Sequence, residues 1–297
     1  MSNRLLWGLI GNEKIGKYSV APKMWKELFK KKGLKVEYFI LGADNSSKIS
    51  LNLKQHFNNK NFVGCNIALP WKHLGYELCN YVENPANRME AINTIIKKGH
   101  SIEGYNTDGI GMVRGIEKLT DLKNKVILIL GSGSSAQTIP HHLINRDVKE
   151  IYVNDIIEER ANRIVRKYSD LSRKKKVSIS SVSEKDLPRL LKRVEIIINT
   201  TPCGMSGFNQ SYPFNKNYIK KINKDCIIAD TVYTPYLTPL LRDLKNRGNK
   251  ISPGVVMLVE QAAESYFLSF GERLTARDKE LMTKVALEEL KNRSNKD

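Results

Sequence analysis

The sequence predicts an α/β protein with two domains. The chain has 297 residues, and at roughly 150 residues per domain this length is enough for two hydrophobic cores. Its hydrophobic content of 41% and charged content of 27% are typical of a globular protein. Short apolar or β-branched runs alternate with longer stretches of helical spacing, a pattern that indicates βαβ units and parallel sheets.

Eight short runs have the composition of strands: Leu5–Ile10, Val36–Ile40, Phe62–Ile67, Val126–Leu130, Glu150–Val153, Val177–Ser180, Ile196–Ile198 and Cys226–Ala229. Apolar residues at helical spacing predict helices in the segments between and after these strands: Pro22–Lys32, Ser134–Asn145, Glu158–Tyr168, Pro235–Arg247 and Val255–Phe270. A seam near Gly109–Thr120 precedes the strand at Val126, and the chain is expected to cross back near Gly254.

The formal net charge of +18 raises the question of a nucleic-acid partner. The basic residues are mostly scattered, and the two runs, Lys30–Lys32 and Arg173–Lys176, have no interleaved aromatic residues. A solvated basic surface and no nucleic-acid partner are therefore predicted. The charge can also attract anionic cofactors and substrates.

The four cysteines lie far apart, with no Cys-x-x-Cys pair, so we expect free thiols and no metal. No apolar run approaches the roughly 20 residues that a membrane helix requires. The first apolar run leads into Gly11-Asn12 without a small-residue cleavage site, which favours a strand over a signal peptide. We expect a cytoplasmic protein without a membrane partner.

A glycine motif follows the strand Val126–Leu130 and points to a nucleotide. Gly131 permits a tight turn, Gly133 lets the backbone approach a pyrophosphate, and small Ala136 lets the following helix pack closely. The helix N-terminus would stabilise the phosphate charge. The motif, completed by Ser132, Ser134 and Ser135, predicts a Rossmann-type dinucleotide-binding domain. The alternative is a glycine-rich turn without a ligand.

Two features follow the motif. The next predicted strand leads into Asn154-Asp155, 24 residues after Gly131, near the spacing at which an acid meets a ribose hydroxyl. Pro140 lies early in the predicted helix, where it removes one backbone hydrogen bond, so a local irregularity is expected there.

Six further stretches occur in an order that resembles the shikimate dehydrogenase family, which includes the quinate/shikimate dehydrogenases. They are Asn66–Lys72, Ala91–Thr94, Gly104–Gly109, Asn199–Met205, Asp230–Pro235 and Gly254–Ala262, and the resemblance runs from about Trp7 to about Phe270. It implies an N-terminal α/β substrate-binding catalytic domain, residues 1–110 with 254–297. A Rossmann nicotinamide-binding domain, residues 111–253, and a C-terminal helical return to the first domain complete the expected architecture.

The resemblance also implies site residues. Lys72 and Asp108 match the catalytic pair, Ser19 matches a carboxylate-binding serine, and Asn93, Tyr233 and Gln261 match contacts to substrate hydroxyls. Thr231 and Gly254 match positions near the nicotinamide, and residues 131–136 match the phosphate loop. The implied reaction is reversible hydride transfer between a nicotinamide cofactor and a hydroxylated cyclohexene or cyclohexane carboxylate, such as shikimate or quinate.

The catalytic pair makes chemical sense, because oxidising a secondary alcohol requires a group that takes the hydroxyl proton. Lys72 can take that proton or relay it, and Asp108 beside it would orient the ammonium. The alternatives are a surface lysine and a helix N-cap. A non-catalytic nucleotide-sensing protein on the same scaffold is the competing hypothesis, since a fold does not settle function.

The cofactor is expected to be NAD, with NADP possible. Members of the family that use NADP tend to carry Asn-Arg-Thr after the second Rossmann strand, whereas this chain has Asn154-Asp155-Ile156-Ile157. A carboxylate accepts hydrogen bonds from a ribose 2′-hydroxyl and repels a phosphate. Arg160 or Arg163 could still fold over the adenine end.

The carboxylate pocket departs from the family pattern. The family usually presents two serines and a threonine, but this chain offers Ser19 with Ala21 and Ala68. A buried carboxylate without donors costs several kcal/mol. Either Lys17 or Tyr18 takes over, or the substrate is a relative of shikimate that differs at that end; backbone groups and water are the further alternative. We expect a small-molecule substrate and a monomer or homodimer.

Overall fold

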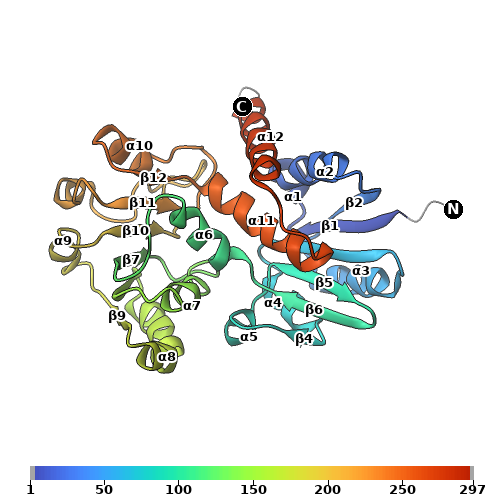
Figure 1. Cartoon of the computed structure of the whole chain (residues 1–297), viewed down its shortest axis with the longest axis horizontal. Helices are drawn as coiled ribbons and strands as arrows, with labels where there is room; N and C mark the ends of the chain where they lie inside the picture. Colours follow the sequence, from blue (N-terminus) through green and yellow to red (C-terminus); the bar gives the residue numbers. More distant parts are fainter. Residues whose placement is uncertain (1–3, 295–297) are drawn as a thin grey trace. The chain divides into compact units, whose positions relative to one another are not determined.

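The computed structural model describes residues 4–294 and divides into two compact units (Figure 1). Unit 1 contains the chain up to Thr107 and the chain from Ala262 onward, and unit 2 is Asp108–Gln261. Helix α11 (Gly254–Phe270) begins in unit 2 and ends in unit 1. The expected domain bounds, with their substrate and cofactor roles, stay a prediction.

Unit 1 is built on a mixed six-stranded sheet in the order β2-β1-β3-β5-β6-β4. The strands are β1 (Leu5–Gly11), β2 (Val36–Gly42), β3 (Phe62–Ile67), β4 (Tyr81–Val82), β5 (Thr94–Lys98) and β6 (Ser101–Tyr105). Its complete helices are α1 (Ile15–Tyr18), α2 (Ala21–Lys31), α3 (Ser46–Asn58), α4 (Lys72–Glu77), α5 (Ala86–Met89) and α12 (Ala276–Ser294).

One strand of this sheet, β5, departs from the parallel arrangement that the sequence predicted. Strand β1 pairs in parallel with β2 and β3, but β5 runs antiparallel to both β3 and β6. Strands β5 and β6 form a hairpin that turns at Gly99, whose φ of 61° lies in the left-handed region that glycine adopts readily. Because its strands are short and partly polar, the hairpin lacks the apolar signal of the neighbouring strands.

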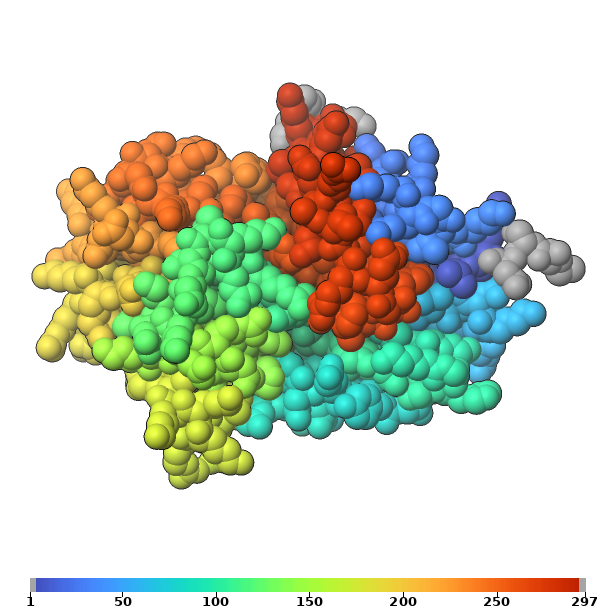
Figure 2. All heavy atoms as spheres, in the orientation of Figure 1, coloured from blue at the N-terminus to red at the C-terminus, as the bar shows by residue number. Residues whose placement is uncertain are grey.

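The C-terminal helix α12 packs against α2 in unit 1 (Figure 2). Its N-terminus is closed by a capping box, in which the Thr275 N–H donates to the Asp278 carboxylate and the Asp278 N–H donates to the Thr275 hydroxyl. Lys31 and Lys32 lie 2.8 and 2.9 Å from the same carboxylate. These contacts hold the N-terminal end of helix α12 to helix α2.

Unit 2 is built on a parallel six-stranded sheet in the order β12-β11-β10-β7-β8-β9. The strands are β7 (Val126–Leu130), β8 (Glu150–Asn154), β9 (Ser178–Ser181), β10 (Ile196–Asn199), β11 (Ile227–Asp230) and β12 (Ile251–Ser252). Its helices are α6 (Asp108–Glu117), α7 (Ile139–Ile144), α8 (Glu158–Lys175), α9 (Leu187–Leu190), the 3₁₀ helix η1 (Lys216–Lys221) and α10 (Pro239–Asn246). This is the Rossmann strand order, which reverses between β7 and β10.

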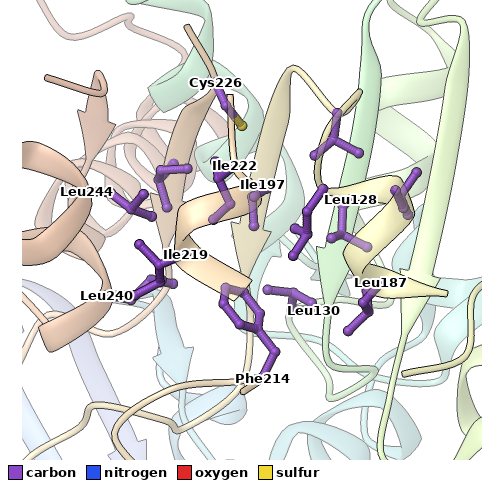
Figure 3. Packing of buried hydrophobic residues seen from close by; sticks show 14 of the residues in the cluster. Leu128, Leu130, Leu187, Ile197, Phe214, Ile219, Ile222, Cys226, Leu240 and Leu244 are labelled. Carbon is purple, nitrogen blue, oxygen red and sulfur yellow. The ribbon is translucent and has the colours of Figure 1, made fainter. Parts of the chain in front are cut away.

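One face of this sheet carries a compact apolar cluster (Figure 3). Leu128, Leu130 and Ile197 project from β7 and β10 toward side chains of α9, η1 and α10. Phe214 lies in the same cluster. The packing fixes the sheet on which the glycine loop is mounted, because close-packed cores resist displacement.

All eight predicted strands are present, with bounds that agree to within two residues. The predicted helix Ser134–Asn145 is wrong in extent, since residues 134–138 form turns and α7 begins only at Ile139. Pro140 then falls in the first helical turn, where its missing N–H breaks no bond. The expected seam near Gly109–Thr120 is mostly helix α6, and α12 was not predicted. No helix within residues 4–294 is long and apolar enough to cross a membrane.

Candidate active site

Lys72 is a buried lysine rather than a surface one. It is the first residue of α4, shortly after β3, and only 9% of it is exposed. Its carbonyl accepts a hydrogen bond from the N–H of Ile92 at 3.0 Å, so the backbone of α4 is tied to the residue before Asn93. Burying a charged side chain is expensive, which favours a specific role for the lysine.

Asn93 is held by Thr107, the last residue of the first of the two chain segments that make up unit 1. The N–H of Thr107 donates to Oδ1 of Asn93 at 2.9 Å, and Nδ2 of Asn93 donates to the Thr107 hydroxyl at 3.0 Å. A backbone N–H can only donate, so the orientation of the Asn93 amide is determined by this pair of bonds.

Asp108 is the first residue of α6 and is 7% exposed. The Ser135 hydroxyl donates to its Oδ2 at 3.3 Å. A Cβ at Gly109 would lie 2.7 Å from the Thr138 carbonyl oxygen, so the start of α6 approaches the end of the glycine loop closely. The predicted catalytic acid and the predicted phosphate loop are therefore in contact within unit 2.

Gln261 is held near the same helix. A Cβ at Gly111 would lie 2.7 Å from both the Cβ and the N atom of Gln261, so α6 and α11 touch at this glycine. Nε2 of Gln261 donates to the Leu258 carbonyl at 3.0 Å. Asp108 and Gln261 thus sit on two helices in direct contact.

The glycine loop lies where the strand order of unit 2 reverses. Gly131 has a φ of 94°, and its N–H donates to the Asn154 carbonyl at 2.7 Å. A Cβ at Gly131 would lie 2.8 Å from Oγ1 of Thr200, in the segment that follows β10. A Cβ at Gly133 would have nothing within 4 Å. The loop therefore has an open face at Gly133, and it lies at the switch point where nucleotides bind in such sheets.

Asp155 is oriented by two hydrogen bonds. The Ser132 hydroxyl donates to its Oδ2 at 2.6 Å, and the N–H of Ile157 donates to its Oδ1 at 2.9 Å. The neighbouring Asn154 directs its amide elsewhere and donates to the Val182 carbonyl at 2.9 Å. Of these two predicted cofactor residues, Asp155 is hydrogen-bonded to Ser132 of the predicted phosphate loop, whereas Asn154 is hydrogen-bonded to the segment after β9.

Thr231 and Gly254, the two residues predicted to lie near the nicotinamide, are close to each other. A Cβ at Gly254 would lie 2.7 Å from the Thr231 carbonyl oxygen and 2.4 Å from that of Val232. Only glycine allows the first turn of α11 to approach the segment after β11 this closely. Tyr233 is half-buried in that segment.

A buried carboxylate anchors the same segment. Asp230 accepts hydrogen bonds from the Val232 N–H at 2.9 Å, the Thr238 hydroxyl at 2.8 Å and Nδ2 of Asn199 at 3.0 Å. Burial raises the pKa of the Asp230 carboxyl to about 6, and these donors oppose the rise. No site role was predicted for Asp230 itself, although its position at the end of a buried strand is a signal for such a role.

Ser19 supplies the one side-chain hydroxyl among the three positions predicted to form the carboxylate pocket. The buried Ser19 accepts the Ala21 N–H on its hydroxyl at 3.3 Å, while its carbonyl accepts a hydrogen bond from Arg293 of α12 at 3.0 Å. Tyr18 is exposed and its hydroxyl interacts with the Asn12 side chain. Within the described part of the chain, no group of His, Cys, Asp or Glu side chains could hold a metal ion.

Two contacts around the site were not predicted from the sequence: those of Ser135 with Asp108 and of Ser132 with Asp155. Both serines belong to the predicted phosphate loop, but nothing in their local sequence indicates their carboxylate partners. The sheet order and the glycine loop at its switch point define the class of unit 2 as a Rossmann-type dinucleotide-binding fold.

Comparisons with known proteins identify the family. Residues 9–95 match the family model of the shikimate dehydrogenase substrate binding domain, and residues 115–220 match that of shikimate / quinate 5-dehydrogenase. Shikimate dehydrogenase (NADP+) of Staphylococcus aureus (strain Newman) is 33% identical over 250 residues, which cover 84% of this chain and 87% of the relative. The chain belongs to the shikimate dehydrogenase family, as the sequence resemblance indicated.

Solved structures agree with this fold. The chorismate mutase/shikimate 5-dehydrogenase fusion protein from Clostridium acetobutylicum is 26% identical, with a TM-score of 0.82 and coverage of 97% of this chain and 99% of that one. Shikimate 5-dehydrogenase from Listeria monocytogenes, in complex with shikimate and NAD, is 23% identical, with a TM-score of 0.84 and coverage of 96% and 97%. Family membership favours the catalytic hypothesis over a nucleotide-sensing protein.

Proposed function

We propose that the protein catalyses reversible hydride transfer between a nicotinamide cofactor and a hydroxylated cyclohexene or cyclohexane carboxylate, of which shikimate and quinate are the first candidates. The observation that carries the proposal is the contact between Asp108 and Ser135. It joins a buried carboxylate to the loop that has an open face for a pyrophosphate. A protein that only binds a nucleotide has no chemical need for this carboxylate.

The proposed chemistry assigns a proton to Lys72. When bound, the nicotinamide supplies the hydride acceptor or donor. As the alcohol is oxidised, Lys72 accepts the proton of the substrate hydroxyl, and in the reverse direction it returns that proton to the carbonyl oxygen. Asp108 stabilises the positive charge on the lysine, and Ser135 orients the carboxylate.

Substrate binding is assigned to the remaining candidates. Asn93, Tyr233 and Gln261 would hydrogen-bond the ring hydroxyls, and Ser19 would bind the carboxylate. The fixed amide of Asn93 supports its assignment, because hydroxyl recognition depends on a donor held in one orientation. We propose the substrate role for unit 1 and the cofactor role for unit 2, with a monomer or homodimer in the cytoplasm.

The preferred cofactor in this proposal is NAD. Two hydrogen bonds hold the Asp155 carboxylate beside the phosphate loop, where it would accept a ribose 2′-hydroxyl and repel a 2′-phosphate. The Staphylococcus aureus relative is described as NADP+-dependent and the Listeria monocytogenes structure contains NAD. The local residues of this chain, rather than the family, therefore carry the proposed preference.

The proposed substrate is a relative of shikimate that differs at the carboxylate end. Ser19 is the one hydroxyl that remains where the family usually has three, because Ala21 and Ala68 replace the others. The Tyr18 side chain is exposed, which makes it a poor substitute donor for a buried carboxylate. Substituting hydroxyl donors by methyl groups disfavours a buried carboxylate.

The test is a spectrophotometric assay of nicotinamide reduction with shikimate, quinate and an aminoshikimate-type acid, each with NAD and with NADP. We expect turnover of at least one acid, faster with NAD, and loss of that turnover in Lys72→Ala. If the protein binds NAD in calorimetry but oxidises none of the acids, the nucleotide-binding alternative replaces the proposal.

A further inference from the structure

Five buried polar side chains of unit 1 form one hydrogen-bonded cluster. They come from β3, from the start of β5 and the residue before it, from the end of the segment that follows β6, and from α11. Each is at most 8% exposed: Asn66, Asn93, Thr94, Thr107 and Ser265. Asn93 is the proposed contact to a substrate hydroxyl, so the cluster surrounds a residue of the proposed site.

Ser265 lies at the centre of this cluster. Its Oγ is 2.8 Å from Oγ1 of Thr94 and 3.3 Å from Oγ1 of Thr107. Nδ2 of Asn66 donates to the same oxygen at 3.2 Å. One hydroxyl on α11 thus contacts side chains that come from three other segments of unit 1.

The protons in the cluster can be assigned from donor and acceptor capacity. The Thr94 hydroxyl donates to Oδ1 of Asn93 at 2.9 Å, and a hydroxyl has one proton. Ser265 must therefore donate to Thr94 rather than accept from it. This assignment leaves the Ser265 oxygen as an acceptor for Asn66 Nδ2, and the one proton of the Thr107 hydroxyl is shared between Ser265 at 3.3 Å and Oδ1 of Asn93 at 3.2 Å.

Removing the Ser265 hydroxyl would change both partners of Asn93. Thr94 would lose the proton that Ser265 donates, and Thr107 would lose Ser265 as an acceptor. The Thr107 hydroxyl would then have only Oδ1 of Asn93, at 3.2 Å, of its two acceptors described above, and that oxygen also accepts from the Thr107 N–H and from Thr94. The amide of Asn93 would be held less well.

A buried serine on this part of α11 calls for an explanation. Its neighbours Ala262, Ala263 and Tyr266 are buried, and an unsatisfied hydroxyl in such surroundings costs roughly 1–3 kcal/mol. Alanine would fill the position without that risk. A serine differs from an alanine at this position by a hydroxyl that contacts Thr94, Thr107 and Asn66.

We propose that Ser265 is a positioning residue that holds the Asn93 amide in the orientation needed to bind a substrate hydroxyl. The inference rests on the proposed function, in which Asn93 contacts the substrate. Ser265 acts through Thr94 and Thr107 and does not touch the substrate itself.

The first experiment compares Ser265→Ala with Ser269→Ala, measuring kcat and the KM values for shikimate and for the nicotinamide cofactor. Ser269 lies one turn further along α11, and its hydroxyl donates only to the Ser265 carbonyl among the contacts described, at 2.6 Å. Loss of about one hydrogen bond of positioning predicts a roughly fivefold rise in the KM for shikimate in Ser265→Ala. The cofactor KM in Ser265→Ala, and all three parameters in Ser269→Ala, should stay unchanged.

A double-mutant cycle with Asn93→Ala separates positioning from general destabilisation. In an Asn93→Ala background, Ser265→Ala should raise the KM no further, because the residue through which it acts is gone. An additional fivefold rise in that background would overturn the inference. So would a shikimate KM that Ser265→Ala leaves equal to that of the unmodified protein.

Two further results keep the test decisive. If Ser265→Ala does not fold, Thr94→Val removes the intermediate hydroxyl and should give the same rise in KM, and an unchanged KM there overturns the inference. If Asn93→Ala itself leaves the KM for shikimate unchanged, the proposed substrate role of Asn93 is wrong. That outcome is distinguishable from a failure of Ser265 alone, in which Asn93→Ala raises the KM and Ser265→Ala does not.

Discussion

Replacing Asp155 by Asn should reverse or abolish the preference for NAD. The substitution keeps the size of the side chain and removes its charge. In the structure the carboxylate accepts hydrogen bonds from Ser132 at 2.6 Å and from the Ile157 N–H at 2.9 Å, so it is held in place beside the phosphate loop. In the proposed binding mode, its charge would face the adenosine ribose of the dinucleotide.

The expected magnitude follows from Coulomb's law. Two unit charges about 5 Å apart repel by about 3 kcal/mol at an effective dielectric constant of 20. Asp155 is half-buried, and solvent reduces this value by about half. A 2′-phosphate carries nearly two charges, which restores the repulsion to about 3 kcal/mol. We therefore expect the ratio of kcat/KM for NADP to that for NAD to rise on the order of 100-fold in Asp155→Asn.

The assay measures kcat/KM for both cofactors at saturating acid substrate, at low and at high salt. Glu158→Gln is the matched control, since Glu158 is an exposed carboxylate in the first turn of α8 without the hydrogen bonds of Asp155. The shift should be small in this control and should shrink with salt in Asp155→Asn. A ratio that changes less than threefold in Asp155→Asn, or an equal shift in Glu158→Gln, would refute the electrostatic explanation.

Three further changes have defined outcomes. Lys72→Ala or Asp108→Ala should lower turnover by on the order of a hundredfold or more with cofactor binding retained in calorimetry, and near-normal turnover of the preferred acid would contradict the mechanism. Ala21→Ser with Ala68→Thr should raise kcat/KM for shikimate, and no gain over an already efficient unmodified protein would argue against the altered pocket. Burial alone would raise the pKa of the Asp278 carboxyl, but its two lysine partners lower it below its usual range. Asp278→Ala should therefore lower the thermal midpoint by roughly 5 °C at pH 7, and the difference should narrow as the pH falls below about 4, because protonation then removes the same contribution; a constant difference would contradict it.

The sequence was sufficient for the framework of unit 2. Val126–Leu130 is a buried strand because its five apolar residues pack on both faces of a parallel sheet. The glycines that follow this strand predict the turn. The sequence did not predict the hairpin of β5 and β6, because polar residues in these strands weaken the apolar pattern that indicates a strand. Helix α12 was likewise missed, because its stability depends on contacts with α2 that lie far away in the sequence.

The same division holds within the site. Motif order was enough to identify the family and to nominate Lys72 and Asp108, since each motif is local. The partners of the site residues were decided only by the tertiary structure: Ser135 and Asp108 are 27 residues apart, and Ser265 and Thr94 are 171 apart. Local periodicity specifies which segments become helices and strands. A hydrogen bond between distant side chains also requires strand register and helix packing to bring two atoms to within about 3 Å, and no local pattern in the chain encodes that distance.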